Sequence, residues 1–72
     1  MSYQQALQDI KLGYYEAAIS KLDPLLHTDP SQPKLWYAKA LALINLQRFG
    51  EAMTSAQLSV QLTPPLPQDI NS

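Results

Sequence analysis

The chain has 72 residues, so we expect one small domain, and a domain of this size buries only about 60% of its unfolded surface. Five Lys/Arg against six Asp/Glu give a formal net charge of −1, without the basic stripe that is typical of nucleic-acid binding. The sequence contains no cysteine, which excludes disulfides, thiol nucleophiles and cysteine-based zinc sites.

Two helices are predicted in the first half of the chain. The first covers residues 2–12, where Ser2 and Gln5 form a capping box and Gly13 provides the left-handed C-terminal residue. The second covers residues 15–28 and carries one apolar stripe at helical spacing. The stripe consists of Ala18, Ile19, Leu22, Leu25 and Leu26.

Pro24 lies inside the second predicted helix. A proline in a helix interior removes a backbone hydrogen bond and costs about 3 kcal/mol or more. Asp23 and Pro24 lie on the side away from Leu22 and Leu26, so we expect an outward kink there. Water would then donate to the freed Ser20 carbonyl. A functional hinge is the alternative interpretation.

Two further helices are predicted in the second half. A loop over residues 28–33 precedes a helix over residues 33–46, with a proline near its start. The last helix covers residues 49–62 and is stopped by several prolines. Because the links within each pair are short, each pair is expected to form an antiparallel hairpin. Residues 65–72 are predicted to form a Pro-rich disordered tail, with a ligand for a proline-binding domain as the alternative.

The two halves of the chain repeat each other with a period of about 34 residues. Small residues recur in both helices, aromatic residues recur at the start of each second helix, and a proline follows each hairpin. This period and this pattern resemble the tetratricopeptide repeat (TPR) family over nearly the whole chain. The matched pairs include Tyr3/Tyr37, Ala6/Ala40, Leu7/Leu41, Ile10/Ile44, Leu12/Leu46, Tyr15/Phe49, Ala18/Ala52 and Pro30/Pro64.

The resemblance implies an all-α fold: two tandem TPR hairpins, with four antiparallel helices in a short right-handed α-solenoid. Residues 1–32 would be repeat one and residues 33–64 repeat two. Close helix approach is expected where alanines face each other, as at Ala6 and Ala18. Three or more repeats are usually needed for stability, so two repeats imply either a homo-oligomer or docking on a larger partner.

Departures from the family pattern carry two further expectations. Polar residues in the first helix stand where the family has apolar or aromatic ones, which suggests an upstream face that no further repeat covers. The prolines after residue 62 prevent a closing amphipathic helix, so Val60 and Leu62 are expected to remain exposed. The polar residues concerned are Gln5, Gln8 and Asp9.

In the TPR family, the first helix of each hairpin lines a concave groove, and this implies a partner-binding surface here. Tyrosines and aliphatic residues with a few polar groups suit a helix or an extended peptide laid in a groove. The alternative is that Leu7, Ile10, Leu41 and Ile44 are simply core. The implied binding residues are Tyr3, Leu7, Ile10, Lys11, Lys34, Tyr37, Leu41, Ile44 and Asn45, and the same mapping puts Gln4 and Ala38 on the groove.

Catalysis has little support in the sequence. His27 is the only histidine, and its place in the last turn of a helix suits an interaction with the helix dipole. The carboxylates form no pair at acid–base or metal-ligand spacing, and no glycine-rich phosphate loop is present. A carboxylate clamp of the kind found in chaperone-binding TPR domains is not expected, because Tyr3, Leu7 and Ala38 occupy its positions.

The expected function is therefore a non-catalytic protein–protein interaction module, a TPR adaptor or complex-assembly factor. The alternatives are a constitutive structural subunit of a larger complex and a fragment of a longer TPR scaffold. The expected partner is another protein, with no nucleic acid, no cofactor and no metal. No apolar run reaches the about 18–20 residues of a membrane span, and residues 1–9 do not read as a secretory signal. A cytoplasmic location without direct membrane insertion is the corresponding expectation.

Overall fold

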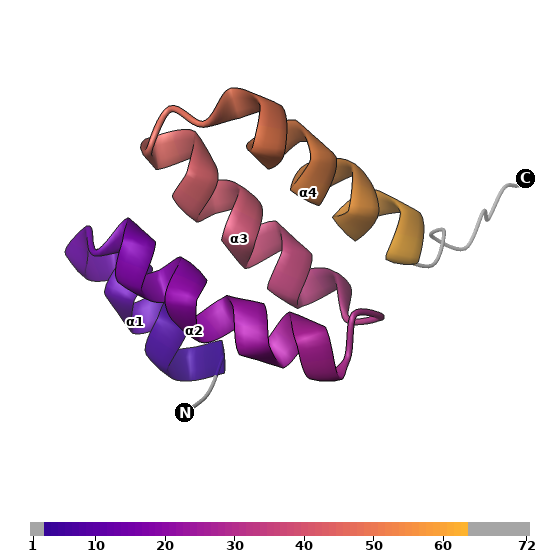
Figure 1. The fold of residues 1–72 in the computed structure, drawn as a ribbon, viewed down its shortest axis with the longest axis horizontal. Helices are drawn as coiled ribbons and strands as arrows, with labels where there is room; N and C mark the ends of the chain where they lie inside the picture. The colour runs from indigo at the N-terminus through magenta and orange to yellow at the C-terminus, as the bar shows by residue number, and fades with distance from the viewer. Residues whose placement is uncertain (1–2, 64–72) are drawn as a thin grey trace, which may run out of the picture.

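The computed structural model describes residues 3–63, and this part of the chain holds four α-helices and no strand (Figure 1). The all-α prediction is confirmed. The second and fourth helices have the predicted bounds, while the third ends one residue early because Leu46 serves as its C-cap. The predicted cap at Ser2 and the predicted tail lie outside the described residues. The helices are α1 Tyr3–Leu12, α2 Tyr15–Thr28, α3 Pro33–Asn45 and α4 Phe49–Leu62.

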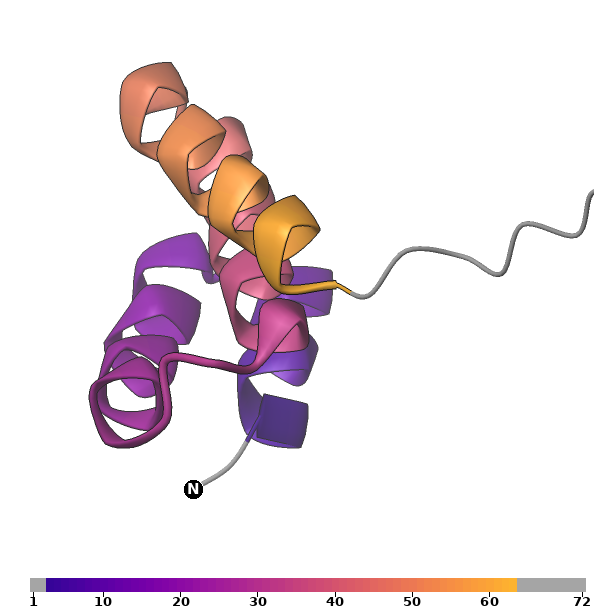
Figure 2. The same cartoon turned by 90° about the vertical axis from the view of Figure 1, so that its right-hand side faces the viewer.

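The helices pack in the order in which they follow each other along the chain. α1 packs against α2, α2 packs against α3, and α3 packs against α4. α1 also touches α3, whereas α4 contacts no described helix except α3. Figures 1 and 2 show α3 running between the first helix pair and α4. Among the described helices, one side of α4 therefore has no neighbour.

Alanines occupy the places where the helices meet. Ala6 on α1 and Ala18 on α2 are completely buried, as the predicted close approach of these two helices requires. Ala40 and Ala52 are buried at the matching places of α3 and α4. Leu22 and Leu43 are the largest side chains that are fully buried among the described residues. The core thus combines alanines with a few leucines.

α1 ends as its glycine predicts. Gly13 has φ +87°, in the left-handed region that favours glycine. The Gly13 amide donates to the Ile10 carbonyl (3.1 Å) and the Tyr14 amide donates to the Asp9 carbonyl (2.8 Å). These two bonds form a Schellman motif, which satisfies carbonyls that the helix end leaves free.

α3 ends with the same motif at the matching place of the second half, but without a glycine. The Gln47 amide donates to the Ile44 carbonyl (2.9 Å), and the Arg48 amide donates to the Leu43 carbonyl (2.9 Å). Gln47 stands where Gly13 stands in the first half, and its φ is +62°. A residue other than glycine in this backbone conformation costs roughly 1–2 kcal/mol of stability.

Gln47→Gly is expected to stabilise the protein by about 0.5–1 kcal/mol, because relief of this strain exceeds the added entropy of the unfolded glycine. A rise in the midpoint of urea unfolding would measure the effect. The reciprocal change Gly13→Gln is the matched control and should lower the midpoint. If Gln47→Gly leaves the midpoint unchanged or lowers it, residue 47 does not carry the strain.

α2 continues through its internal proline from Tyr15 to Thr28. Asp23 and Pro24 are exposed while Leu22 and Leu26 are buried, so the predicted outward placement of Pro24 is confirmed. The carboxylate of Asp23 forms an ion pair with Nζ of Lys39 on α3 (2.8 Å). This exposed face of α2 is thereby tied to the second hairpin by a polar contact outside the core.

The loop between α2 and α3 is fixed by Asp29 and Trp36. The Asp29 carboxylate accepts hydrogen bonds from the Ser31 amide (3.2 Å), the Ser31 hydroxyl (2.6 Å) and the Gln32 side-chain amide (3.0 Å). The hydrogen bond from the Ser31 hydroxyl, followed by those from Gln32 and the Ser31 amide, lowers the pKa of Asp29. Nε1 of Trp36 donates to the Pro30 carbonyl (2.8 Å). These bonds hold the start of α3 against the loop.

The sequence prediction for Asp9 is wrong. Asp9 does not lie on an open polar face: it is buried between the first two helices, and its carboxylate accepts a hydrogen bond from Nζ of Lys21 on α2. Gln5 and Gln8 do lie exposed on α1. The pattern misleads at Asp9 because the polarity of a residue does not reveal an ion partner on another helix.

Candidate functional site

Two matching stripes of side chains run along α1 and α3, and together they form what we call the inner face. α1 contributes Tyr3, Leu7 and Ile10, and α3 contributes Tyr37, Leu41 and Ile44. Within each stripe the residues are spaced by four and then three positions, which puts them on one side of a helix. Because α1 and α3 are in contact, the structure brings the two stripes onto neighbouring helices.

The α3 stripe is the more open of the two. Tyr37 is 56% exposed and Ile44 is 48% exposed, while Leu41 between them is half-buried. Ile44 is therefore not a core residue, so the alternative of a purely core role does not hold at this position. Free apolar surface of this kind is what an interaction with another protein would cover.

The α1 stripe serves the core as well. Tyr3, Leu7 and Ile10 are half-buried and pack against the cluster that contains Ala6 and Leu22. The core alternative thus holds in part for Leu7 and Ile10. Their remaining surface, together with Tyr3, lies on a helix that contacts α3.

Ala38 was expected on the groove, and the structure corrects this. Its side chain is completely buried and belongs to the core cluster with Leu35, Ala6 and Ala18. Ala38 is one position away from Tyr37 in sequence, and a helix turns about 100° per residue, so neighbours face different sides. Ala38 positions α3 and is not available to a ligand.

The polar residues of the predicted set have distinct places. Nζ of Lys34 lies 4.9 Å from the centre of the Tyr3 ring, a cation–π contact that links α3 to α1. Lys11 and Gln4 are exposed on α1. Nδ2 of Asn45 donates to the Leu41 carbonyl one turn back (2.8 Å), so part of its amide is used within α3.

The charge beside the inner face is positive. Neither Lys11 nor Lys34 forms an ion pair with a carboxylate within residues 3–63. Asp9, the one carboxylate on α1 or α3, is held by Lys21. An acidic group on a bound partner would therefore meet lysines that no carboxylate within residues 3–63 holds in an ion pair.

A hollow of about 330 Å³ opens at the end of this surface, next to the loop between α2 and α3. Tyr3 and Lys34 of the predicted set line it together with Asp29 and Gln32, which are hydrogen-bonded to each other. Leu25, Thr28 and Leu35 complete the lining. The inner face thus leads into a recess with both apolar and polar walls.

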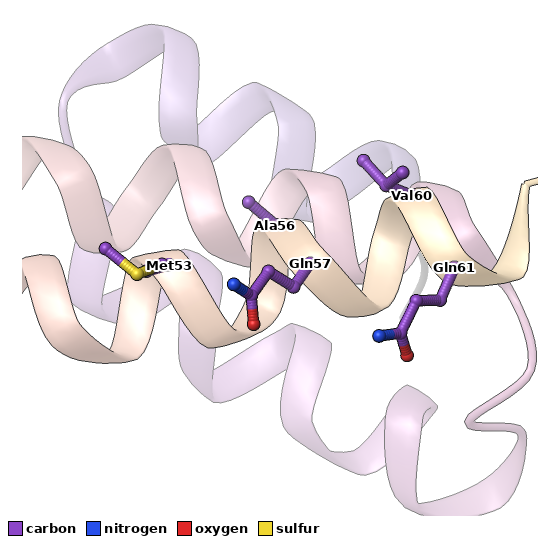
Figure 3. Close-up of a pocket in the computed structure, with 5 residues that line it drawn as sticks. All are labelled: Met53, Ala56, Gln57, Val60 and Gln61. Atoms are coloured by element: carbon purple, nitrogen blue, oxygen red, sulfur yellow. The ribbon is translucent and has the colours of Figure 1, made fainter.

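Sequence reasoning missed most of a second open surface, on α4. Phe49 is 60%, Met53 62% and Val60 73% exposed. Together with the half-buried Ala56 they form what we call the α4 stripe. Met53, Ala56 and Val60 border a hollow of about 470 Å³, which Gln57 and Gln61 also line (Figure 3). The expected exposure of Val60 and Leu62 is confirmed. The helical spacing of residues 49, 53, 56 and 60 is the sequence signal that could have revealed Phe49, Met53 and Ala56.

His27 is exposed in the last turn of α2, as predicted from its position. The described residues contain no group of three His, Cys, Asp or Glu side chains that could hold a metal ion. No helix described by the structure is long and apolar enough to cross a membrane.

Comparisons with protein-family models, with curated proteins and with solved structures find no match to this chain.

Proposed function

We propose that this chain is a non-catalytic protein-interaction module of the TPR type, an adaptor or assembly factor of the cytoplasm. It binds a segment of another protein along the inner face of α1 and α3. No cofactor takes part, and neither nucleic acid nor a membrane is the target.

The internal repetition supports the TPR part of the proposal. α1 and α3 end in the same pair of backbone hydrogen bonds, at matching places of the two halves. The alanine pairs Ala6/Ala18 and Ala40/Ala52 are buried at matching places of the two hairpins. The order of helix contacts, with α3 packed on both α2 and α1, suits two hairpins stacked as consecutive repeats.

One observation carries the binding part: Tyr37 and Ile44 are about half exposed on the same side of α3, next to the α1 stripe. Tyrosine gives a large contact area together with a hydrogen-bonding tip, which makes it frequent among binding hot spots. The described residues leave about half of each side chain uncovered, and both residues belong to the predicted groove.

The chemistry of this surface describes the expected ligand. Apolar side chains of a helix or extended segment would cover Tyr37, Leu41 and Ile44. Acidic groups of the ligand would lie near Lys11 and Lys34, neither of which forms an ion pair within the described residues. An apolar segment with flanking Asp or Glu is therefore the class of partner that fits.

Substitutions on the inner face test the proposal. Tyr37→Ala and Ile44→Lys are each expected to reduce retention of a partner by tenfold or more in pull-downs with tagged protein from the source lysate. Helicity measured by circular dichroism should not change, because both side chains are exposed. Met53→Lys, an equally exposed apolar position on α4, is the matched control and should retain the partner.

The same experiment separates the proposal from its main alternative, a constitutive structural subunit. Proteins retained at fixed ratio by wild type, Tyr37→Ala and Ile44→Lys alike would contradict binding along the inner face. They would place the contact elsewhere on the molecule, and loss with Met53→Lys alone would place it on α4.

A further inference from the structure

The two hairpins differ in how well they are covered, and the difference lies on α4. Leu26 on α2 is 6% exposed, but its counterpart in the second hairpin, Val60, is 73% exposed. Leu22 is fully buried, whereas its counterpart Ala56 is only half-buried. α3 covers α2, and no described helix covers α4 on the corresponding side. α4 therefore exposes a surface whose counterpart on α2 is covered in the first hairpin.

Stacking of a second copy in the manner of a further repeat does not suit this surface. In that arrangement α1 of the added copy would take the place that α3 takes on α2. The buried Ala38 and Ala42 of α3 correspond to Gln4 and Gln8 of α1, which are exposed polar residues. Head-to-tail stacking would bury both amides in an apolar contact, which is costly unless each finds a hydrogen-bond partner.

The α4 stripe is instead complementary to itself. Its members follow one another at intervals of four, three and four residues, and this series is the same in both directions. Two antiparallel copies of α4 related by a two-fold axis between residues 54 and 55 would bring Phe49 opposite Val60 and Met53 opposite Ala56. Each larger side chain then faces a smaller one, as close packing between helices requires.

The border of the stripe also suits a contact between identical surfaces. A two-fold contact brings the same patch of both copies together, so unpaired charges of one sign near the axis would repel each other. Gln57 and Gln61 border the stripe, and both side chains are uncharged. Glu51, the only charged residue of α4, is bound by Arg48 through hydrogen bonds of 2.9–3.1 Å.

We infer that two copies of this chain pair through α4, antiparallel about a two-fold axis, with Phe49, Met53, Ala56 and Val60 at the contact. The inner face belongs to α1 and α3, so pairing through α4 leaves both inner faces of the dimer free. The dimer would present two such faces, and the inference does not depend on what they bind.

Disulfide trapping tests the geometry, and the absence of native cysteine makes it specific. An equimolar mixture of Phe49→Cys and Val60→Cys chains should form a covalent heterodimer in a glutathione redox buffer. Each variant alone should not, because its two thiols would stand roughly 16 Å apart along the helices. Leu12→Cys mixed with Val60→Cys, a pair of exposed positions on different helices, controls for random collision. Cross-linking of each variant alone, or none above this control, would overturn the arrangement.

Sedimentation equilibrium tests the pairing itself. One helix face is a small interface, so the mass should be followed from about 1 μM to 1 mM chain, a range that reaches weak association. Wild type should approach twice the chain mass, and Val60→Lys and Met53→Lys should remain at the chain mass with unchanged circular dichroism. Leu12→Lys, also exposed, should associate like wild type. A wild type that stays monomeric over the whole range, or unchanged association of both α4 variants, would overturn the inference.

Discussion

Lys21→Ala is expected to lower the free energy of unfolding by about 2 kcal/mol, because it leaves the buried Asp9 carboxylate without its cation. The side chain of Asp9 is only 13% exposed, and no other cation is paired with it among residues 3–63. Breaking a fully buried pair costs about 3–5 kcal/mol. The side chain of Lys21 is 36% exposed, so solvent screening reduces the value here. Urea unfolding followed by circular dichroism measures the loss.

The second hairpin supplies the matched control for this prediction. The counterparts of Asp9 and Lys21 in the second hairpin are Leu43 and Ser55, both buried. The double variant Asp9→Leu/Lys21→Ser copies that uncharged arrangement into the first hairpin and should unfold at or above the wild-type urea midpoint. If Lys21→Ala matches wild type, or the double variant is less stable than Lys21→Ala, the ion pair does not have the role described.

Ala18→Leu is expected to destabilise the protein by about 1–3 kcal/mol through overpacking. Ala18 is completely buried on α2 in the same cluster as Ala6 on α1, so three added carbon atoms must displace a neighbouring helix. Ala17→Leu, at the exposed position beside it, adds the same atoms on the outside of α2 and should leave stability within about 0.5 kcal/mol. Thermal unfolding of the two variants and wild type gives the comparison.

A melting temperature of Ala18→Leu equal to that of Ala17→Leu would contradict the close approach of α1 and α2. The counterpart Ala52→Leu extends the test to the second hairpin, where Ala52 is buried between α4 and α3. A similar loss at both positions would also support the proposed repetition of the two hairpins.

The helices themselves could be predicted because their signals are local. Apolar residues at helical spacing, Gly13 and the prolines indicate where the helices begin and end, and α3 differs from its prediction by one residue at Leu46. Gln47 was not recognised as a left-handed residue, although it is the counterpart of Gly13. Glutamine carries no intrinsic preference for that conformation, so only the position within the repeat could have revealed it.

Packing between helices could be predicted less well. Asp9 appeared to be a surface residue because its partner, Lys21, lies 12 positions away on another helix. Ala38 was assigned to the groove from the resemblance, as a residue on the first helix of its hairpin. Both errors have the same origin: helix periodicity tells which residues share a side, and the neighbours alone decide whether that side is covered.

The surfaces follow the same rule. Tyr37 and Ile44 were assigned to the inner face from the resemblance to a repeat family, and the structure leaves both exposed. Phe49 and Met53 were not recognised, because an apolar residue on an amphipathic helix normally indicates core. They are exposed because no described helix packs on that side of α4, and the periodicity of α4 cannot reveal whether a neighbour is present.

The most direct test of the proposed function is an amide chemical-shift map of this chain, recorded by NMR while a partner segment captured in the pull-down is added. The proposal predicts that the largest shifts follow the inner face, at Tyr37, Leu41 and Ile44 on α3 and at Lys11 on α1. Shifts confined to α4, residues 49–62, with α3 unchanged along this stripe, would contradict it.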